Sequence, residues 1–474
     1  MGLARTAYVD GRWVDQPEHF EVRDPFDRAV IAEVAETSDE LIDAAVDAAA
    51  RAFTTWRSRP GPERGKLLGK LAQAMLADER RLAELCTREN GKPSAEAVTE
   101  VRYAASFLTW FAGEAERIYG ETIPATNPGQ RLTVIREPIG PCALITPWNF
   151  PYAMLTRKLG AALAAGCTIV AKPAEQTPLG ALALGELCDQ VGIPAGVVNL
   201  VPASDGARAG GRLIGAPKIR KVSFTGSTAV GRIILRSCAE DIKRVSLELG
   251  GNAPFVVFAD ADLEAALRGA MVAKFRNSGQ TCVAANRFIL EAPIAEAFTR
   301  MLVAQVARLK LGRGSDEGVD LGPVIDDAAV AKLQKLVGDA ISRGAKILHG
   351  KPPEGKSHVV APIVLAGVTP EMAIWREEIF GPVVALRTAA DEADAIAQAN
   401  DTDAGLIAYF YTRDGARQTR VAEALEAGMI GINEGLVSTA QAPFGGVKHS
   451  GLGREGSRHG LDDYTSLKYM AARI

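Results

Sequence analysis

Short apolar runs rich in β-branched residues alternate with helical stretches between about residues 141 and 250. Such alternation with short loops predicts a parallel β-sheet that helices cover on both faces. The predicted strands are 142–146, 168–171, 197–201, 222–225 and 245–249. The helices predicted between them are 151–165, 178–191, 206–214 and 228–238. The fold class is therefore α/β.

A second α/β region is predicted after Gly251. Asp262 is expected to cap a helix that runs to about Arg276, where Asn277-Ser278-Gly279 breaks the helical pattern. The strands predicted in this region are 255–258, 287–290, 382–386, 407–411 and 429–433.

Two further parts of the chain have patterns of their own. Thr37 to Glu40 is typical of a capping box ahead of an amphipathic helix at 38–56, and helical pattern continues to about Ile118. Segment 131–138 is predicted to be a strand outside the first sheet. We expect it to bridge subunits together with the tail near 464–474.

Composition narrows the functional classes. The chain has 474 residues, enough for two or three domains, and a formal net charge of -3, so a nucleic-acid partner is not expected. Its six cysteines form no CxxC pair, which argues against a zinc site and a disulfide framework and favours a reducing, cytoplasmic location. The longest mainly apolar run, near 159–171, is too short to span a membrane.

Polar residues follow the predicted strands of the first sheet. Asn149, Lys172 and Ser227 come after three of them, and Glu248 lies within the end of another. Ligands of such sheets bind beyond the carboxyl ends of the strands, so these side chains are expected to share one site. A charged residue in an apolar run is either an ion-pair partner or a functional group. As a general base, Glu248 would have its pKa raised by burial.

Cys282 lies in the segment FRNSGQTC, just past a predicted helix. Most free cysteines are small buried apolar residues, but the polar and flexible neighbours of Cys282 indicate a loop, where a thiol can act as a nucleophile. The C-terminal end of the helix would raise the thiol pKa, so activation must come from a base or from backbone amides. No histidine lies in a motif near Cys282, so nothing indicates a Cys-His hydrolase.

Glycine-rich segments suggest where a phosphate could bind. GLGREG (451–456) matches G-x-G-x-x-G, but no βαβ unit follows it, and we interpret it as a turn. At Gly226-Ser227 a strand ends and a helix begins, which favours a pyrophosphate. Gly250 and Gly251 would let a ligand approach the backbone closely. Lys172 and Glu175 are either a surface turn or a pair that binds the hydroxyls of an adenosine ribose, and a carboxylate there prefers NAD to NADP.

Together these segments resemble the aldehyde dehydrogenase family over nearly the whole chain. The matching stretches, in the order the family has them, are 147–151, 172–178, 224–232, 247–251, 279–282, 377–383 and 443–446. The resemblance implies a Rossmann-like cofactor domain, a second α/β catalytic domain and a small β element for oligomerisation. We expect the cofactor domain to comprise 1–119 and 139–250, and the catalytic domain to comprise 251–448. The oligomerisation element is expected at 120–138 and 449–474. A homodimer or homotetramer is implied, and no metal is needed.

The resemblance also implies residue roles. Cys282 would be the nucleophile that carries a thioester, Glu248 the base that activates the deacylating water, and the Asn149 amide with the Cys282 N–H the oxyanion hole. The implied cofactor contacts, for NAD with NADP as the alternative, are Thr146, Trp148, Lys172, Glu175, Gly226, Ser227, Val230, Leu249, Glu378 and Phe380.

The segments 156–167, 274–287 and 451–464 are most similar to succinate-semialdehyde dehydrogenases. That resemblance implies that Arg157 and Arg276, with Ser438, bind the distal carboxylate of succinate or glutarate semialdehyde, although each arginine could equally be an ordinary ion-pair partner. Ala284 stands where some relatives have a second cysteine, so no regulatory disulfide is expected there. The alternatives are a broad-specificity aldehyde dehydrogenase, a CoA-acylating enzyme, a non-catalytic scaffold and a thiol hydrolase.

Overall fold

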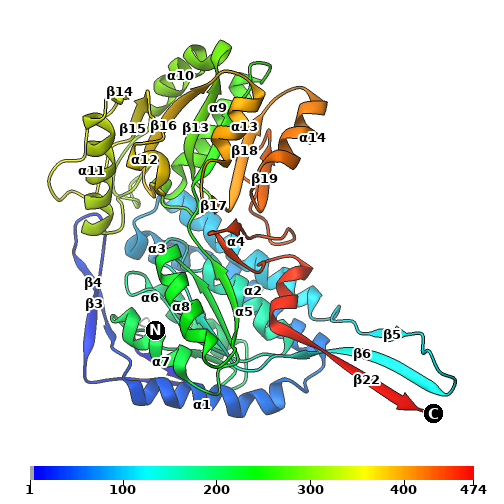
Figure 1. The fold of residues 1–474 in the computed structure, drawn as a ribbon. Coiled ribbons are helices and arrows are strands. Elements are labelled where there is room, and N and C mark those ends of the chain that lie inside the picture. The colour runs from blue at the N-terminus through cyan, green and yellow to red at the C-terminus, as the bar shows by residue number, and fades with distance from the viewer. Residues whose placement is uncertain (1–4) are drawn as a thin grey trace.

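The computed structural model describes residues 5–474, so the first four residues of the predicted domain 1–119 lie outside it. Two α/β lobes stand one above the other, and an extended arm leaves the lower one (Figure 1). The α/β class predicted from the sequence is confirmed.

The lower lobe is built on an eight-stranded sheet with the order β2-β1-β9-β8-β7-β10-β11-β21. Its five central strands run parallel, and β1, β2 and β21 pair antiparallel at the edges. All five strands predicted between 142 and 249 are confirmed as this parallel core. The strands are β1 (Ala7–Val9), β2 (Arg12–Val14), β7 (Cys142–Ile145), β8 (Ile169–Lys172), β9 (Val198–Leu200), β10 (Lys221–Thr225), β11 (Arg244–Glu248) and β21 (Gly451–Leu452).

Helices cover this sheet because its central strands are apolar on both faces. The four predicted helices of this region are confirmed. The helices of the lobe are α1 (Asp39–Trp56), α2 (Gly61–Ala77), α3 (Glu79–Asn90), α4 (Ser94–Glu114), α5 (Ala153–Ala165), α6 (Pro178–Gln190), α7 (Gly206–Gly215) and α8 (Thr228–Ala239).

The predicted capping box of the first helix is wrong by one residue. Ser38, not Thr37, is the N-cap, and its hydroxyl accepts from the Leu41 N–H at 3.3 Å. The Thr37 hydroxyl instead donates to the Pro202 carbonyl at 2.6 Å, which ties the segment before α1 to the loop after β9. The Thr37 hydroxyl, which the local pattern assigns to the helix cap, is therefore engaged in a tertiary hydrogen bond instead.

The upper lobe is built on a seven-stranded sheet with the order β14-β15-β16-β13-β12-β18-β19. All five strands predicted after Gly251 are present. As predicted, Asp262 caps α9, accepting from the Ala265 N–H at 3.0 Å. The strands are β12 (Ala253–Val257), β13 (Ala285–Glu291), β14 (Lys346–His349), β15 (Ile363–Ala366), β16 (Val383–Ala389), β18 (Ile407–Tyr411) and β19 (Met429–Ile432). The helices are α9 (Leu263–Phe275), α10 (Ala292–Val306), α11 (Asp327–Ser342), α12 (Ala373–Arg376), α13 (Glu392–Asn400) and α14 (Gly415–Ala424).

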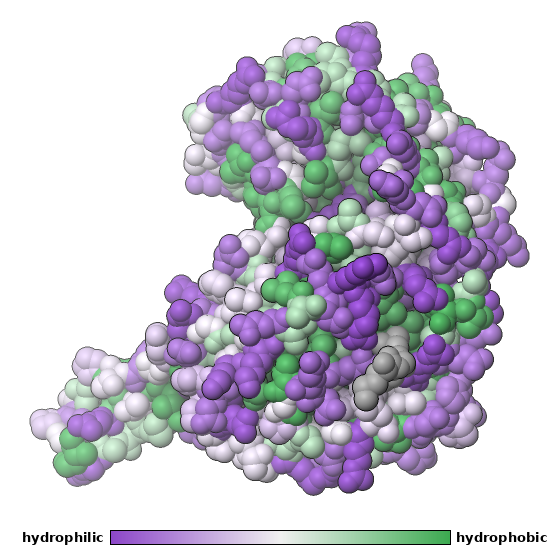
Figure 2. All heavy atoms as spheres, turned by 180° about the vertical axis from the view of Figure 1, so that it is seen from behind, coloured by the Kyte–Doolittle hydropathy of each residue, from purple (hydrophilic) through white to green (hydrophobic). Residues whose placement is uncertain are grey.

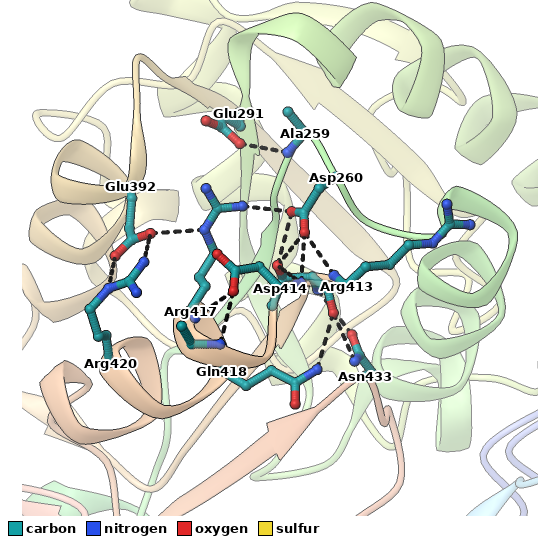
Figure 3. A network of polar contacts seen from close by, with 12 residues as sticks. Ala259, Asp260, Glu291, Glu392, Arg413, Asp414, Arg417, Gln418, Arg420 and Asn433 are labelled. Atoms are coloured by element: carbon teal, nitrogen blue, oxygen red, sulfur yellow. Dashed lines mark hydrogen bonds and ion pairs between the residues drawn. The ribbon is translucent and has the colours of Figure 1, made fainter.

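An ion-pair network fixes α14 and α13 to the loop after β12 (Figure 3). Asp260 accepts from the Thr412 hydroxyl, from the N–H groups of Arg413 and Asp414, and from Arg417 at 2.6 Å. Arg417 continues to Glu392 at 2.8 Å. The carboxylate of Asp260 is thus fully engaged in holding the edge of the lobe together.

The arm is a three-stranded antiparallel sheet of β5 (Glu121–Ile123), β6 (Gln130–Pro138) and β22 (Thr465–Arg473). β6 and β22 pair over nine residues, from Gln130 opposite Arg473 to Pro138 opposite Thr465. This confirms the strand that the sequence predicted outside the first sheet. Figure 2 shows the arm projecting from the body with apolar side chains on its surface. Leu467 and Tyr469 of β22 are 67% and 60% exposed.

Two short pairings complete the fold. β3 (His19–Arg23) pairs with β4 (Val30–Ala35), and β17 (Ala404–Gly405) pairs with β20 (Val447–Lys448). The turn predicted at GLGREG begins with β21, which pairs with the end of β11, so this segment lies beside Glu248. Within residues 5–474 no helix has both the length and the apolar character needed to cross a membrane.

Candidate active site

A cavity of about 460 Å³ lies where the two lobes meet. The loops after β7, β10 and β11 supply one side, and α11 and the turn before β13 supply much of the other. Ten residues singled out from the sequence line it, namely Trp148, Asn149, Gly226, Ser227, Glu248, Leu249, Gly250, Cys282, Glu378 and Phe380. The structure thus brings together residues that lie up to 232 positions apart in the chain.

Cys282 stands in a turn, half-buried, after a kinked segment. Asn277 and Ser278 have positive φ values of 50° and 55°, so the right-handed helix is interrupted by a kink here instead of continuing. The kink is held by the Glu96 carboxylate, which accepts from the Asn277 N–H at 2.7 Å, and by the Ser278 hydroxyl, which donates to the Gly322 carbonyl at 2.8 Å. The predicted loop is therefore a rigid turn.

The thiol of Cys282 is not pre-ionised. Burial raises its pKa to about 12, and the nearby Arg157 cation opposes this only in part. The sequence attributed a raised pKa to the helix end; the direction is confirmed, but the main cause is burial. A proton acceptor is therefore needed when the thiol reacts.

Glu248 is the last residue of β11 and is 2% exposed. Within the described chain neither of its carboxylate oxygens has a hydrogen-bond partner. Burial, followed by the nearby Glu455 carboxylate, raises the pKa of Glu248 well above its ordinary value. Gly445 makes room for it, because a Cβ there would lie 2.9 Å from Glu248 Oε1. A buried carboxyl without partners at a cavity wall is suited to accept a proton.

Asn149 follows β7 and points into the same cavity. Its Nδ2 donates to the Gln280 carbonyl at 3.0 Å, and its Oδ1 has no partner in residues 5–474. Because an amide nitrogen carries two hydrogens, one N–H remains free. The Cys282 backbone N–H likewise makes no hydrogen bond within the described residues. Two donors are thus available close to the thiol.

The other end of the cavity fits a nucleotide. Ser227 caps α8, whose N-terminus faces the cavity with its unpaired N–H groups, an arrangement that favours phosphate. Trp148 and Phe380 meet edge to face at 5.5 Å and form an aromatic wall. Glu378 accepts from the Gly251 N–H at 3.0 Å, and burial raises its pKa to about 7.

The paired glycines after Glu248 serve protein groups. A Cβ on Gly250 would lie 2.8 Å from a Glu378 oxygen, and one on Gly251 would lie 2.4 Å from the Cys282 carbonyl oxygen. Gly250 lines the cavity, so the close approach of a ligand that the sequence suggests for this backbone stays a prediction. The two glycines also let two predicted site residues, Glu378 and Cys282, pack against the end of β11.

The remaining cofactor candidates lie outside the cavity wall. Lys172 and Glu175 pair at 3.4 Å beyond the end of β8, and burial lowers the Lys172 pKa. The buried Thr146 donates its N–H to the Lys172 carbonyl at 3.2 Å, and Val230 is exposed on α8. These residues lie near the edge of the sheet at which α8 begins.

The two substrate arginines differ. Arg157 is buried, pairs with Glu455 at 3.3 Å and donates from its Nη2 to the Tyr103 hydroxyl at 2.8 Å. Its guanidinium also lies 4.3 Å from the centre of the Phe444 ring. The guanidinium of Arg276 packs on the Phe150 ring at 5.3 Å and makes no ion pair or hydrogen bond within residues 5–474. Ser438 is half-buried in the loop after β19.

Sequence reasoning missed several cavity residues. Ile325 and Asp326, just before α11, and Lys332 of α11 line it, and Thr225 lines it from the end of β10. Thr225 could have been found, since it ends a predicted strand of the first sheet. The α11 residues have no local signal, because only the packing of the two lobes brings them to the cavity.

Known proteins are similar to this chain over nearly its whole length. A family model described as "Aldehyde dehydrogenase family" matches residues 13–470. The glutarate-semialdehyde dehydrogenase of Pseudomonas putida is 51% identical, over 99% of this chain and 98% of its own. The NADP+-dependent succinate-semialdehyde dehydrogenase of Escherichia coli is 50% identical, over 98% of this chain and 97% of its own.

Solved structures agree with the sequence matches. The crystal structure of an aldehyde dehydrogenase from Brucella melitensis biovar abortus superposes with a TM-score of 0.97 at 50% identity, covering 100% of this chain and 98% of that one. The chain therefore belongs to the aldehyde dehydrogenase family and is an oxidoreductase that acts on aldehydes with NAD or NADP.

Proposed function

We propose that this enzyme oxidises a short ω-semialdehyde, succinic or glutaric, to the dicarboxylate through a thioester on Cys282. The observation that carries the proposal is the convergence of Cys282, Glu248 and Asn149 on one cavity, with both Glu248 oxygens unpartnered. This set supplies a nucleophile, a base and oxyanion donors, which together are what acyl transfer from an aldehyde requires.

In the first step Cys282 Sγ bonds to the aldehyde carbon, and the thiol proton leaves to water. The free N–H of the Asn149 amide and the Cys282 N–H stabilise the alkoxide, a contribution of about 3–4 kcal/mol per donor. The nicotinamide, when bound, supplies the acceptor for the hydride, which leaves a thioester. Glu248 then takes a proton from water, the hydroxyl adds to the thioester carbon, and the C–S bond breaks to release the acid.

The cofactor would be held by two groups of residues. Trp148, Gly226, Ser227, Leu249, Glu378 and Phe380 line the cavity around the N-terminus of α8. Lys172 with Glu175, and Thr146 and Val230 nearby, would hold the adenosine part. Glu36 and Asp205 also act on the charge of Lys172, so a 2′-phosphate bound there would lie in the negative field of these carboxylates and of Glu175. We therefore propose a preference for NAD, tested by kcat/KM with each cofactor and with Glu175→Ser, which should shift the preference towards NADP.

The substrate assignment rests on the free guanidinium of Arg276 and on the relatives that act on semialdehydes. An unpaired arginine beside the Cys282 turn can bind a distal carboxylate through two parallel hydrogen bonds. Arg276→Ala should raise KM for succinate or glutarate semialdehyde but not for an uncharged aldehyde of equal length. Equal turnover of both aldehydes by the unchanged enzyme would favour the broad-specificity alternative.

Arg157 and Ser438 remain candidates for the same carboxylate. Arg157 retains an unpartnered buried Nε, although its Nη1 donates to Glu455 and its Nη2 donates to Tyr103. Arg157→Ala should therefore lower stability as well as affinity, because it leaves Glu455 buried without this partner. If neither arginine variant changed KM for the semialdehyde, the carboxylate assignment would fail.

One assay separates the reaction classes. The enzyme with semialdehyde and NAD should give NADH and free dicarboxylate in equal amounts without added CoA. An acyl-CoA product would indicate the acylating alternative. Acid formed without NADH would indicate a thiol hydrolase, and no product at all a non-catalytic scaffold.

The assembly and the location are proposals as well. We propose a homodimer or homotetramer joined through the arm, because apolar side chains of β22 are exposed there. Removing residues 465–474 should lower the mass measured by light scattering. We also propose the division into cofactor, catalytic and oligomerisation domains, with boundaries after residues 119, 138, 250 and 448. A cytoplasmic location is proposed as well, consistent with six free cysteines.

A further inference from the structure

A fully buried lysine lies directly behind the Asn149 loop. Lys92 stands between α3 and α4, and its ammonium donates to the Glu100 carboxylate and, at 2.8 Å, to the backbone carbonyl of Asn149. It also lies 4.0 Å above the centre of the Phe150 ring. A buried ammonium is costly unless it is fully engaged, so these contacts fix its position closely.

A second donor reaches the same carbonyl. The side-chain amide of Asn277, in the kinked segment before Cys282, donates to the Asn149 carbonyl at 3.0 Å. Its backbone is held in the left-handed conformation by the hydrogen bond to Glu96. Both lone pairs of one carbonyl are therefore engaged, one by Lys92 and one by the residue that begins the nucleophile turn.

The Asn149 side chain completes the arrangement. Its Nδ2 is oriented by the Gln280 carbonyl of the same turn, which leaves the second N–H free. Glu100 also accepts from the Tyr152 N–H at 3.0 Å, so the backbone on the far side of Asn149 is held too. The direction of the free N–H thus depends on a backbone that Lys92, Asn277 and Glu100 fix.

We propose that Lys92 and Asn277 are positioning residues that aim the Asn149 amide at the substrate oxygen. The inference rests on the proposed oxyanion role of Asn149 and goes beyond it, since neither residue lines the cavity. A misplacement of about 1 Å in such a donor costs on the order of 10²-fold in rate. A residue that served only to neutralise Glu100 would affect folding without acting through Asn149.

Double-mutant cycles test this dependence. Lys92→Met is combined with Glu100→Gln so that no buried charge is left unpaired, and the pair is placed in the wild type and in Asn149→Ala. The readout is the single-turnover rate of NADH formation at saturating substrate. We expect a loss of about 10- to 100-fold in the wild type and of less than about 2-fold in Asn149→Ala, because no amide then remains to be aimed.

Two further variants make the test decisive. Lys221→Met removes another fully buried lysine, at the start of β10, and should leave the rate unchanged. Asn277→Gly keeps the left-handed backbone but removes the amide, and its cycle with Asn149→Ala decides the question if the Lys92 pair variant fails to fold, as judged by circular dichroism.

The outcomes separate the inference from the proposed function. Equal losses in both backgrounds, or no loss in the wild type, would overturn the positioning role while leaving the oxyanion role intact. An Asn149→Ala enzyme with the full single-turnover rate would instead overturn the oxyanion role itself.

Discussion

Two carboxylates at the ends of parallel strands have opposite surroundings. Asp260, just past β12, accepts hydrogen bonds from Thr412, from the Arg413 and Asp414 N–H groups and from Arg417 (Figure 3). Glu248, at the end of β11, accepts none within the described chain. The hydrogen bonds and Arg417 outweigh burial and lower the pKa of Asp260, whereas burial raises that of Glu248.

The difference separates a structural carboxylate from a reactive one. A saturated carboxylate stabilises the folded state through each hydrogen bond it receives. An unsatisfied buried carboxyl destabilises the folded state when charged, and it persists where it faces a site that uses it. The surroundings of each carboxylate, rather than its place at a strand end, decide whether it is structural or reactive.

Among the variants that test this contrast, Glu248→Gln should have the largest effect, which is on the steady-state rate. Without a base for water the thioester accumulates, and the steady-state rate should fall about 10²- to 10⁴-fold while a first burst of NADH remains. Stopped-flow absorbance measures both phases. A variant with an unchanged steady-state rate would remove Glu248 from the reaction, whereas Asp260→Asn should keep the full rate.

The free energy of unfolding should respond to the two variants in the opposite order to the rate, with the larger loss in Asp260→Asn. Asp260→Asn loses charge-assisted hydrogen bonds and should lower the free energy of unfolding by about 1–3 kcal/mol. Glu248→Gln should leave it unchanged or raise it at pH 8, because a raised folded pKa means that ionisation above about pH 4.3 opposes folding. Urea unfolding of both variants measures this. A Glu248 variant as destabilised as the Asp260 variant would contradict the comparison.

The contribution of Asp260 should also depend on pH. Its pKa is lowered in the folded state, so the contribution is present above the ordinary value of about 3.9 and is lost as the pH falls through the folded pKa. The difference in unfolding free energy between wild type and Asp260→Asn should therefore shrink with acidification below about pH 4. A constant difference down to pH 2 would show that the variant acts through packing instead.

The smallest expected effect concerns Glu378. Its pKa of about 7 means that the carboxylate, which accepts hydrogen bonds from hydroxyl groups, forms as the pH rises through neutrality. The affinity for NAD, followed by quenching of tryptophan fluorescence, should rise a few-fold from pH 6 to pH 8. Glu378→Gln should flatten this dependence, and an unchanged slope would assign it to another group.

The sequence predicts most of the fold for a simple physical reason. Buried parallel strands are continuous apolar runs, and the Asp262 cap is a local hydrogen bond, so both leave local signals. The capping box at Thr37 failed because a contact with Pro202, far along the chain, took its hydroxyl. Neighbouring residues cannot reveal such a partner.

The site is predicted to a similar extent. Cys282, Glu248 and Asn149 were found because each departs from its local pattern or matches a motif. Lys332 of α11 and Lys92 behind Asn149 were not, because their roles depend on packing between segments far apart in sequence. The ion pair of Arg157 with Glu455 likewise joins residues 298 positions apart.

The central claim is most directly tested by trapping the acyl enzyme. Glu248→Gln protein is mixed with succinate semialdehyde and NAD, quenched in acid during the NADH burst and analysed by peptide mass spectrometry. The account predicts one succinyl group per active site, on the peptide that contains Cys282, and none in Cys282→Ala. A full burst of NADH from the Cys282→Ala enzyme, or an acyl group on another residue, would contradict it.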